Sequence, residues 1–145
     1  MRGRPVSGSG IPAFCPHGYP RGMVQVLTHL TFQHHRAGEA IEFYVGLIPD
    51  SRIDERVPVG EGREMIRFTL AGRPFIAADS PPVHAWDFTP AVSIFLECGT
   101  AAEVDRLFTA LAESGFVFMP LADYGFNPRF GWVADRFGVS WQLAQ

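Results

Sequence analysis

A strand, a glycine-containing turn and a second strand occur twice in this chain, and this repeat limits the folds that it can adopt. The clearer copy is 131–143, where the turn residues 135–138 separate two segments rich in aromatic and β-branched residues. The weaker copy is 66–77, with Gly72 in its turn. A shift of 64 positions also superimposes a helical pattern at 37–47 on a second one at 101–111. The sequence therefore predicts two βαβββ units in tandem.

The predicted fold class is α+β, with tandem βαβββ modules at about 24–80 and 90–145 that form a cupped mixed sheet. Both modules belong to a single domain, 23–145, because the chain is long enough to bury one core. A ferredoxin-like sandwich, with accidental similarity between the halves, is the alternative. The expected strands are 24–33, 53–58, 64–70, 73–78, 91–98, 116–119, 130–134 and 139–144.

The ends of these elements carry their own signals. Thr100 and Glu103 form a capping-box pattern before the second helix, and Gly115 is the expected C-cap. Residues 1–22 contain five glycines and four prolines without hydrophobic periodicity, so we expect a disordered or loosely packed extension there.

Composition excludes several classes of function. A net charge of −3 provides no basic surface for nucleic acid, and the longest apolar runs are too short to span a bilayer. The two cysteines form no disulfide framework, which favours a cytoplasmic protein. All 12 basic residues are arginine. The chain therefore has no lysine for a Schiff base or for a phosphate-binding P-loop.

Strand alternation predicts a polar sheet face opposite the helices. In the first strand Leu30 and Phe32 should pack on a helix, while the alternate residues face the other way. The same alternation packs Val92, Ile94 and Leu96, and also Trp141 and Leu143. The opposite face should then carry His29, Thr31, Gln33, Arg67, Thr69, Ser93, Phe95, Glu97, Ser140 and Gln142. Such a face suits a small ligand or a metal better than it suits a second core layer.

Four segments identify a family. Residues 27–32, 40–44, 49–51 and 131–142 together resemble the vicinal-oxygen-chelate (glyoxalase/bleomycin-resistance/dioxygenase) superfamily. The last segment is most similar to the PhnB-like branch, often labelled 3-demethylubiquinone-9 3-methyltransferase. The resemblance covers about 23–145 and implies paired βαβββ modules, a homodimer, and a small-molecule site in the cupped sheet.

The resemblance also implies where a divalent metal would be bound. The superfamily's metal enzymes take one ligand from the first strand and one from the last strand of each module. These positions fall on His29, on Ile76, at or near Ser93, and on Gln142. His29 is a good ligand and Gln142 a weak one, so this chain departs from the pattern with an incomplete set.

The family label also names methyl transfer, which the residues do not support. A nucleotide-type cofactor usually binds where a glycine-rich turn opens a helix. The Gly-x-Gly segments at 8–10 and 60–62 open no predicted helix.

Three hypotheses follow for the function. In the first, the chain binds a small polar or anionic organic molecule without a complete metal site. In the second, it is a metal-dependent or acid–base enzyme of lyase, isomerase or dioxygenase type, with His29 and Glu97 as proton carriers. In the third, it has a structural or partner-binding role. Arg67 is either an anion anchor or the ion-pair partner of Glu97. The remaining predicted ligand contacts are Thr31, Gln33, Tyr124 and Arg129.

Overall fold

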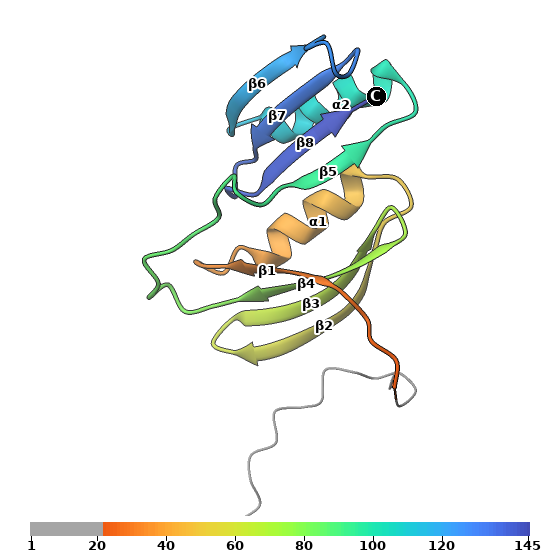
Figure 1. Cartoon of the computed structure of the whole chain (residues 1–145). Helices are drawn as coiled ribbons and strands as arrows, with labels where there is room; N and C mark the ends of the chain where they lie inside the picture. Colours follow the sequence, from red (N-terminus) through yellow and green to blue (C-terminus); the bar gives the residue numbers. More distant parts are fainter. Residues whose placement is uncertain (1–21) are drawn as a thin grey trace, which may run out of the picture.

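The computed structural model describes residues 22–145, and within them the chain forms two βαβββ modules (Figure 1). Module one consists of β1 (Thr28–Phe32), α1 (Ala37–Leu47), β2 (Arg52–Gly60), β3 (Arg63–Leu70) and β4 (Arg73–Asp79). Module two consists of β5 (Ile94–Glu97), α2 (Ala101–Ala112), β6 (Phe116–Ala122), β7 (Phe130–Ala134) and β8 (Ser140–Ala144). The predicted tandem duplication is therefore confirmed, whereas the prediction for the N-terminal extension falls almost entirely outside the described residues.

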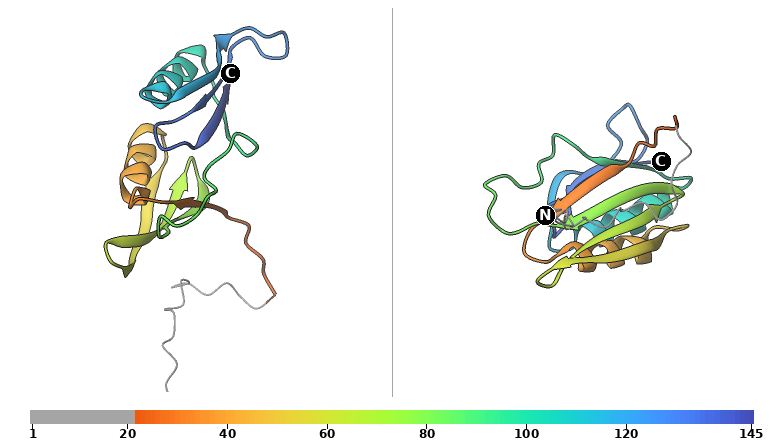
Figure 2. Two further views of the ribbon diagram at one scale, coloured as in Figure 1. Left: turned by 90° about the vertical axis from the view of Figure 1, so that its left-hand side faces the viewer. Right: turned by 90° about the horizontal axis from the view of Figure 1, so that it is seen from below.

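Both modules have the same sheet topology. The strand order is β1-β4-β3-β2 in module one and β5-β8-β7-β6 in module two. The first and last strands of each module pair in parallel, and the other pairs are antiparallel. Each helix covers one face of its own sheet, and both helices lie on the same side of the molecule (Figure 2). We call the sheet face turned away from the helix the open face.

Two strands are shorter than the sequence pattern predicts. β1 begins at Thr28, which pairs with Phe75 of β4. The residue before Phe75 is Pro74. Proline has no N–H to extend that ladder. β5 begins at Ile94, which pairs with Trp141, and in this register Val92 would fall opposite Val139, which lies before β8. The expectation that Val92 packs with Ile94 and Leu96 is therefore wrong, and Val92 is 73% exposed.

The second helix begins as predicted and ends differently. Thr100 Oγ1 accepts the N–H of Glu103 at 3.2 Å, which caps the N-terminus of α2. The Glu103 carboxylate binds Arg106 at 2.6 Å instead of closing the capping box. Ser114, with φ of 56°, takes the left-handed position after the helix that was expected of Gly115. Gly115 meets a steric requirement instead, because a Cβ there would lie 2.2 Å from the Ala134 carbonyl oxygen.

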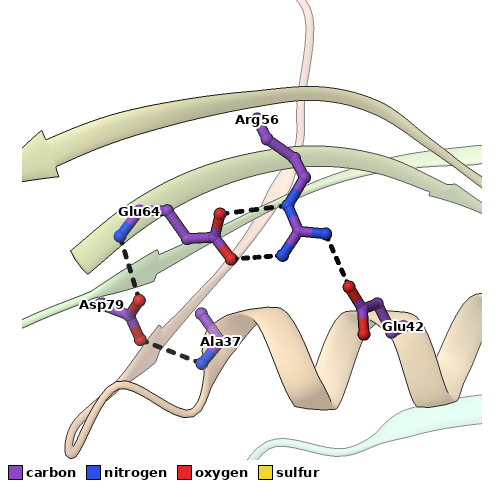
Figure 3. Close-up of polar contacts among 5 residues, drawn as sticks. All are labelled: Ala37, Glu42, Arg56, Glu64 and Asp79. Carbon is purple, nitrogen blue, oxygen red and sulfur yellow. Dashed lines mark hydrogen bonds and ion pairs between the residues drawn. The ribbon is translucent and has the colours of Figure 1, made fainter. Parts of the chain in front are cut away.

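The N-terminus of α1 is held by side chains of the sheet (Figure 3). Arg36 provides no side-chain cap, and the buried Asp79 of β4 replaces it: Oδ1 accepts the N–H of Ala37 at 2.9 Å. The second oxygen of Asp79 accepts the N–H of Glu64 at 3.0 Å. Arg56 then joins the two elements, because it binds Glu64 of β3 at 2.6 Å and Glu42 of α1 at 2.7 Å. These arginine pairs are partly exposed, so they add little stability beyond positioning the helix.

A buried carboxylate joins the two modules. Asp135, in the β7–β8 turn, is 4% exposed, and its Oδ2 accepts the Tyr44 hydroxyl of α1 at 2.5 Å and Trp141 Nε1 at 2.8 Å. Its Oδ1 accepts the backbone N–H groups of Phe137 and Val139 at 2.9 and 3.0 Å. The rings of Tyr44 and Trp141 meet edge to face at 4.9 Å. The closing strand–turn–strand therefore carries the polar centre of the core shared by both modules.

Candidate functional site

Ladder register shows which residues of the two modules are equivalent. On the open face of module one, His29 of β1 lies opposite Ile76 of β4, and Ile76 lies opposite Arg67 of β3. In module two the corresponding row is Phe95 of β5, Gln142 of β8 and Trp132 of β7. The counterpart of His29 is therefore Phe95 rather than Ser93.

A cleft of about 810 Å³ runs along the seam between β1 and β5. Its walls are mostly apolar and include Leu30, Phe75, Phe88, Ile94 and Leu107. The polar and charged wall residues are Thr28, His29, Arg73, Asp87, Ser93, Glu97, Cys98, Glu103, Thr89 and Ser140. This combination of apolar walls and a few polar groups is typical of sites for small organic molecules.

His29 lies in the wall of this cleft. Its Nδ1 lies 3.3 Å from the Thr31 hydroxyl, and the ring keeps contact with solvent. Partial burial lowers the pKa of His29, so the neutral imidazole is the form favoured near pH 7. Glu97 lies in the same cleft, but no nearby carboxylate raises the pKa of His29. The structure therefore brings the two predicted proton carriers to one cleft without coupling their charges.

Two of the other predicted ligand contacts, Gln33 and Tyr124, form hydrogen bonds within the protein instead. Gln33 holds the loop after β4, since its Nε2 donates to the Trp86 carbonyl at 2.9 Å and its Oε1 accepts the N–H of His84 at 3.2 Å. The Tyr124 hydroxyl donates to the Pro120 carbonyl at 2.6 Å.

The two predicted arginines lie outside the cleft walls. Arg129 forms a close ion pair with Asp105 of α2, on the helix side of the sheet. Arg67 lies on the open face of module one but is not a wall residue, and Arg73 is the guanidinium that lines the cleft.

Gln142 belongs to a network of side chains on the open face of module two. Its Nε2 donates to Ser93 Oγ at 3.2 Å, and Ser93 Oγ lies 2.7 Å from Ser140 Oγ. Ser140 Oγ also accepts the indole N–H of Trp132 at 2.8 Å. The amide nitrogen of Gln142 is thus bound within the protein. Two members of this network, Ser93 and Ser140, lie in the wall of the cleft.

The residues at the four implied metal positions do not fit a divalent cation. His29 offers an imidazole and Gln142 an amide, whereas Ile76 and Phe95 offer no ligand atom. Zinc sites take three or four ligands from cysteine, histidine and carboxylates, and harder cations take several oxygens. Over residues 22–145, no group of three or more His, Cys, Asp or Glu side chains gathers to hold a metal ion.

The sequence indicated Phe95 and Tyr124 near the site but not the aromatic clusters on the open face of module two to which they belong. Phe95, Tyr124, Phe126 and Phe130 form one set of ring contacts, and Phe116, Phe118 and Trp132 form another. Strand alternation alone places Phe130 and Trp132 on one face of their strand. Tyr124 of the loop before β7 is one of the predicted ligand contacts, whereas the ring contacts of this loop with Phe130 follow only from tertiary packing.

The duplicated modules and the seam cleft define a protein of the glyoxalase/bleomycin-resistance/dioxygenase fold. The chain belongs to the 3-demethylubiquinone-9 3-methyltransferase family, whose model matches residues 24–144. The resemblance inferred from the sequence is thereby confirmed. No curated protein matches the chain significantly.

Solved structures support the same assignment. The PhnB protein of Bacillus cereus is 39% identical, with a TM-score of 0.79 over 83% of this chain and 98% of that one. Protein PA1353 of Pseudomonas aeruginosa is 28% identical, with a TM-score of 0.71 over 84% of this chain and 97% of that one. A fosfomycin resistance protein of Listeria monocytogenes, FosX, solved with Mn(II), shares the fold at 14% identity and a TM-score of 0.56, over 84% of this chain and 93% of that one. Within the described residues, no helix is long and apolar enough to cross a membrane.

Proposed function

We propose that this PhnB-like protein binds a small organic molecule in the seam cleft and lacks a complete metal centre. The observation that carries the proposal is the cleft of about 810 Å³, in which apolar walls surround a few polar groups. The chemistry of the four ligand-equivalent positions, with Ile76 and Phe95 among them, supports the absence of a metal centre.

The wall residues suggest how a ligand would be oriented. Nε2 of the neutral His29 ring can donate or accept one hydrogen bond, since Nδ1 lies near the Thr31 hydroxyl, and the Ser93 hydroxyl has one position left beside Gln142 and Ser140. Arg73 replaces Arg67 as the guanidinium within reach of a carboxylate or phosphate on the ligand. A polar or anionic molecule with an apolar body would satisfy both parts of the wall.

Ligand-observed NMR on the full chain tests this proposal. A library of small organic acids and amides is screened with and without EDTA, and the purified protein is analysed for metals. We expect EDTA to leave binding unchanged and the metal content to be far below one ion per chain. Tight stoichiometric metal that EDTA removes together with binding would overturn the proposal.

A cleft-filling substitution locates the site. Thr28 is an exposed residue of the cleft wall, so Thr28→Trp should fill the cavity and abolish binding. Thr109→Trp, on the exposed face of α2 and outside the cleft, is the matched control and should bind as the parent does. Equal affinity of the two variants would place the ligand elsewhere.

The lowered pKa of His29 supports a second function, that of an acid–base enzyme. A ring that is neutral near pH 7 can abstract a proton from a cleft-bound substrate, with Glu97 as a further proton carrier. We expect His29→Gln to lower kcat by at least 100-fold with the fold intact. An unchanged rate would exclude this role. Methyl transfer has no such support, since Gly60 and Gly62 flank the β2–β3 turn and open no helix.

We also propose a cytoplasmic homodimer. Val24 and Val26, just before β1, are 88% and 85% exposed, and a second copy of the chain would remove them from water. Sedimentation of the Val24→Ser/Val26→Ser variant should show a weaker dimer. Val83→Ser, also strongly exposed, is the control. A monomeric parent protein would refute the dimer.

A further inference from the structure

A second, smaller cavity lies beside the seam cleft, on the open face of module two. It measures about 440 Å³, and three phenylalanine rings, Phe95, Phe126 and Phe130, lie in its wall together with the carboxylate side chain of Glu97. Phe95 and Glu97 of β5, and Cys98 after them, belong to the walls of both cavities, so the two sites adjoin along this strand. We call Phe95, Glu97, Phe126 and Phe130 of this cavity the aromatic box.

Phe130 contacts both of the other rings of the box, at two different angles. Phe126 and Phe130 meet edge to face, with centroids 5.0 Å apart and an interplanar angle of 71°. Phe95 lies 6.4 Å from Phe130 at 35°, so the three rings form walls rather than a single stack. Tyr124, outside the cavity wall, stacks on Phe126 at 6.1 Å and meets Phe130 edge to face at 6.0 Å.

Two of these rings, Phe95 and Phe126, remain open to solvent, whereas Phe130 between them is 4% exposed and forms the floor of the box. Phe126 is 67% exposed and Phe95 is 51% exposed, whereas the core aromatic residues of the same module are almost fully buried. Isolated exposed phenylalanines are common, but a set in mutual contact around a cavity indicates a binding site.

Glu97 is the charged side chain of this cavity, and its charge is not neutralised within the described residues. No hydrogen bond or ion pair joins the side chain of Glu97 to another residue of 22–145, and this side chain lies in the cavity wall with the rings. Arg129 directly precedes Phe130 of the box, but its guanidinium binds Asp105 of α2 and does not neutralise Glu97. The Asn127 side chain is also engaged, since Nδ2 donates to the Gln145 carbonyl and Oδ1 accepts the N–H of Arg129.

We propose that the aromatic box binds a small organic ammonium ion, such as a quaternary or methylated amine. The faces of aromatic rings attract cations through their quadrupoles, and the effect grows when the cation is weakly hydrated. The nearby carboxylate of Glu97 adds a full negative charge to the site. A primary ammonium retains its hydration shell and is held less well. The ammonium site adjoins the site proposed for the seam-cleft ligand, because Phe95 and Glu97 belong to the walls of both cavities.

Titration calorimetry with choline tests the proposal on the full chain. The neutral isostere 3,3-dimethyl-1-butanol has the same shape without the charge. We expect choline to bind at least tenfold more tightly than the alcohol. Equal affinity for the two compounds would mean that the site recognises the apolar shape of the ligand and not its charge, and the proposal would be wrong.

Three variants identify the groups that bind choline. Phe126→Leu and Glu97→Gln should each weaken choline affinity by about 3- to 10-fold, because each removes one attraction to the cation. Phe116→Leu is the matched control, since Phe116 is 63% exposed and belongs to the other set of rings. It should bind choline as the parent does.

The same variants show whether the aromatic box is a ligand site or part of an interface between two copies of the chain. Circular dichroism checks that each variant is folded, and sedimentation gives its oligomeric state. If the parent protein does not bind choline and Phe126→Leu dissociates it into monomers, the rings belong to a subunit interface and the proposal fails. If all three variants bind choline equally, the proposal is also overturned.

Discussion

The buried carboxylate of Asp135 accepts four hydrogen bonds, and its replacement by an amide should weaken the join between the modules. Asp135→Asn keeps the shape of the side chain but turns one acceptor oxygen into an NH2 group. If the amide oxygen keeps the two backbone N–H groups, its nitrogen faces the indole N–H of Trp141. The indole can only donate, so a buried donor loses its partner.

The magnitude follows from these contacts. An unsatisfied buried donor costs about 1–3 kcal/mol, and the remaining bonds lose the roughly twofold strength that a charged acceptor provides. Removing the buried charge offsets part of this loss, because desolvation raises the pKa of Asp135 above its usual value of 3.8. We expect a net loss of about 2–4 kcal/mol in the free energy of unfolding. For a chain of this length, Tm should fall by about 5–12 °C.

Urea unfolding at pH 7, followed by circular dichroism and tryptophan fluorescence, measures this loss. Asp123→Asn is the matched control, because Asp123 is exposed and accepts only the N–H of Gly125 in its own loop. It should stay within about 0.5 kcal/mol of the parent. If Asp135→Asn were equally close to the parent, the carboxylate would not hold the modules together.

The pH dependence provides an independent check. A raised pKa means that the folded state binds the Asp135 proton more tightly than the unfolded state does. This contribution to stability is complete below the usual value of 3.8 and is lost as the pH rises through the folded-state pKa. The difference in free energy of unfolding between the parent and Asp135→Asn should therefore shrink as the pH rises over that range. A widening difference would contradict the assignment.

Three further predictions concern single positions. The His29 ring should titrate below 6.5 in an NMR pH series, because burial disfavours its charged form; a value above 6.5 would refute the neutral ring. Gly131→Ala should cost about 1–3 kcal/mol in urea unfolding, since its Cβ would lie 2.5 Å from the ring of Phe108, whereas Gly99→Ala has open space and should cost far less. Asp79→Asn should lose about 1–2 kcal/mol, because one of the two backbone N–H groups it accepts would face an NH2 group; full stability would refute its role in holding α1.

Much of the fold could be predicted from local pattern. The stripe Val104, Leu107 and Leu111 has helical spacing, and all three side chains are buried as that spacing predicts. Alternation in β1 correctly placed Leu30 and Phe32 in the core. These predictions succeed because each depends only on neighbours within one element.

The candidate site was less predictable, because it depends on partners distant in the sequence. Gln33 shares a strand face with His29, yet its amide is bound to the backbone of the loop after β4. Arg129 has the charge for a ligand contact, and its actual partner is Asp105, which lies 24 residues earlier. A residue pattern shows what a side chain can bind but not which partner lies within reach.

The sequence by itself determined the duplicated βαβββ modules, the faces of most strands and the family, since strand and helix periodicity and turn chemistry are local. Only the tertiary structure decided that Phe95, not Ser93, is the counterpart of His29, because the parallel ladder of β5 with β8 sets that register. It also decided that the closing turn, recognised first as a repeat signal, carries the carboxylate that joins the modules through Tyr44. Such choices depend on contacts made across the whole chain, where chain packing rather than residue type selects the partner.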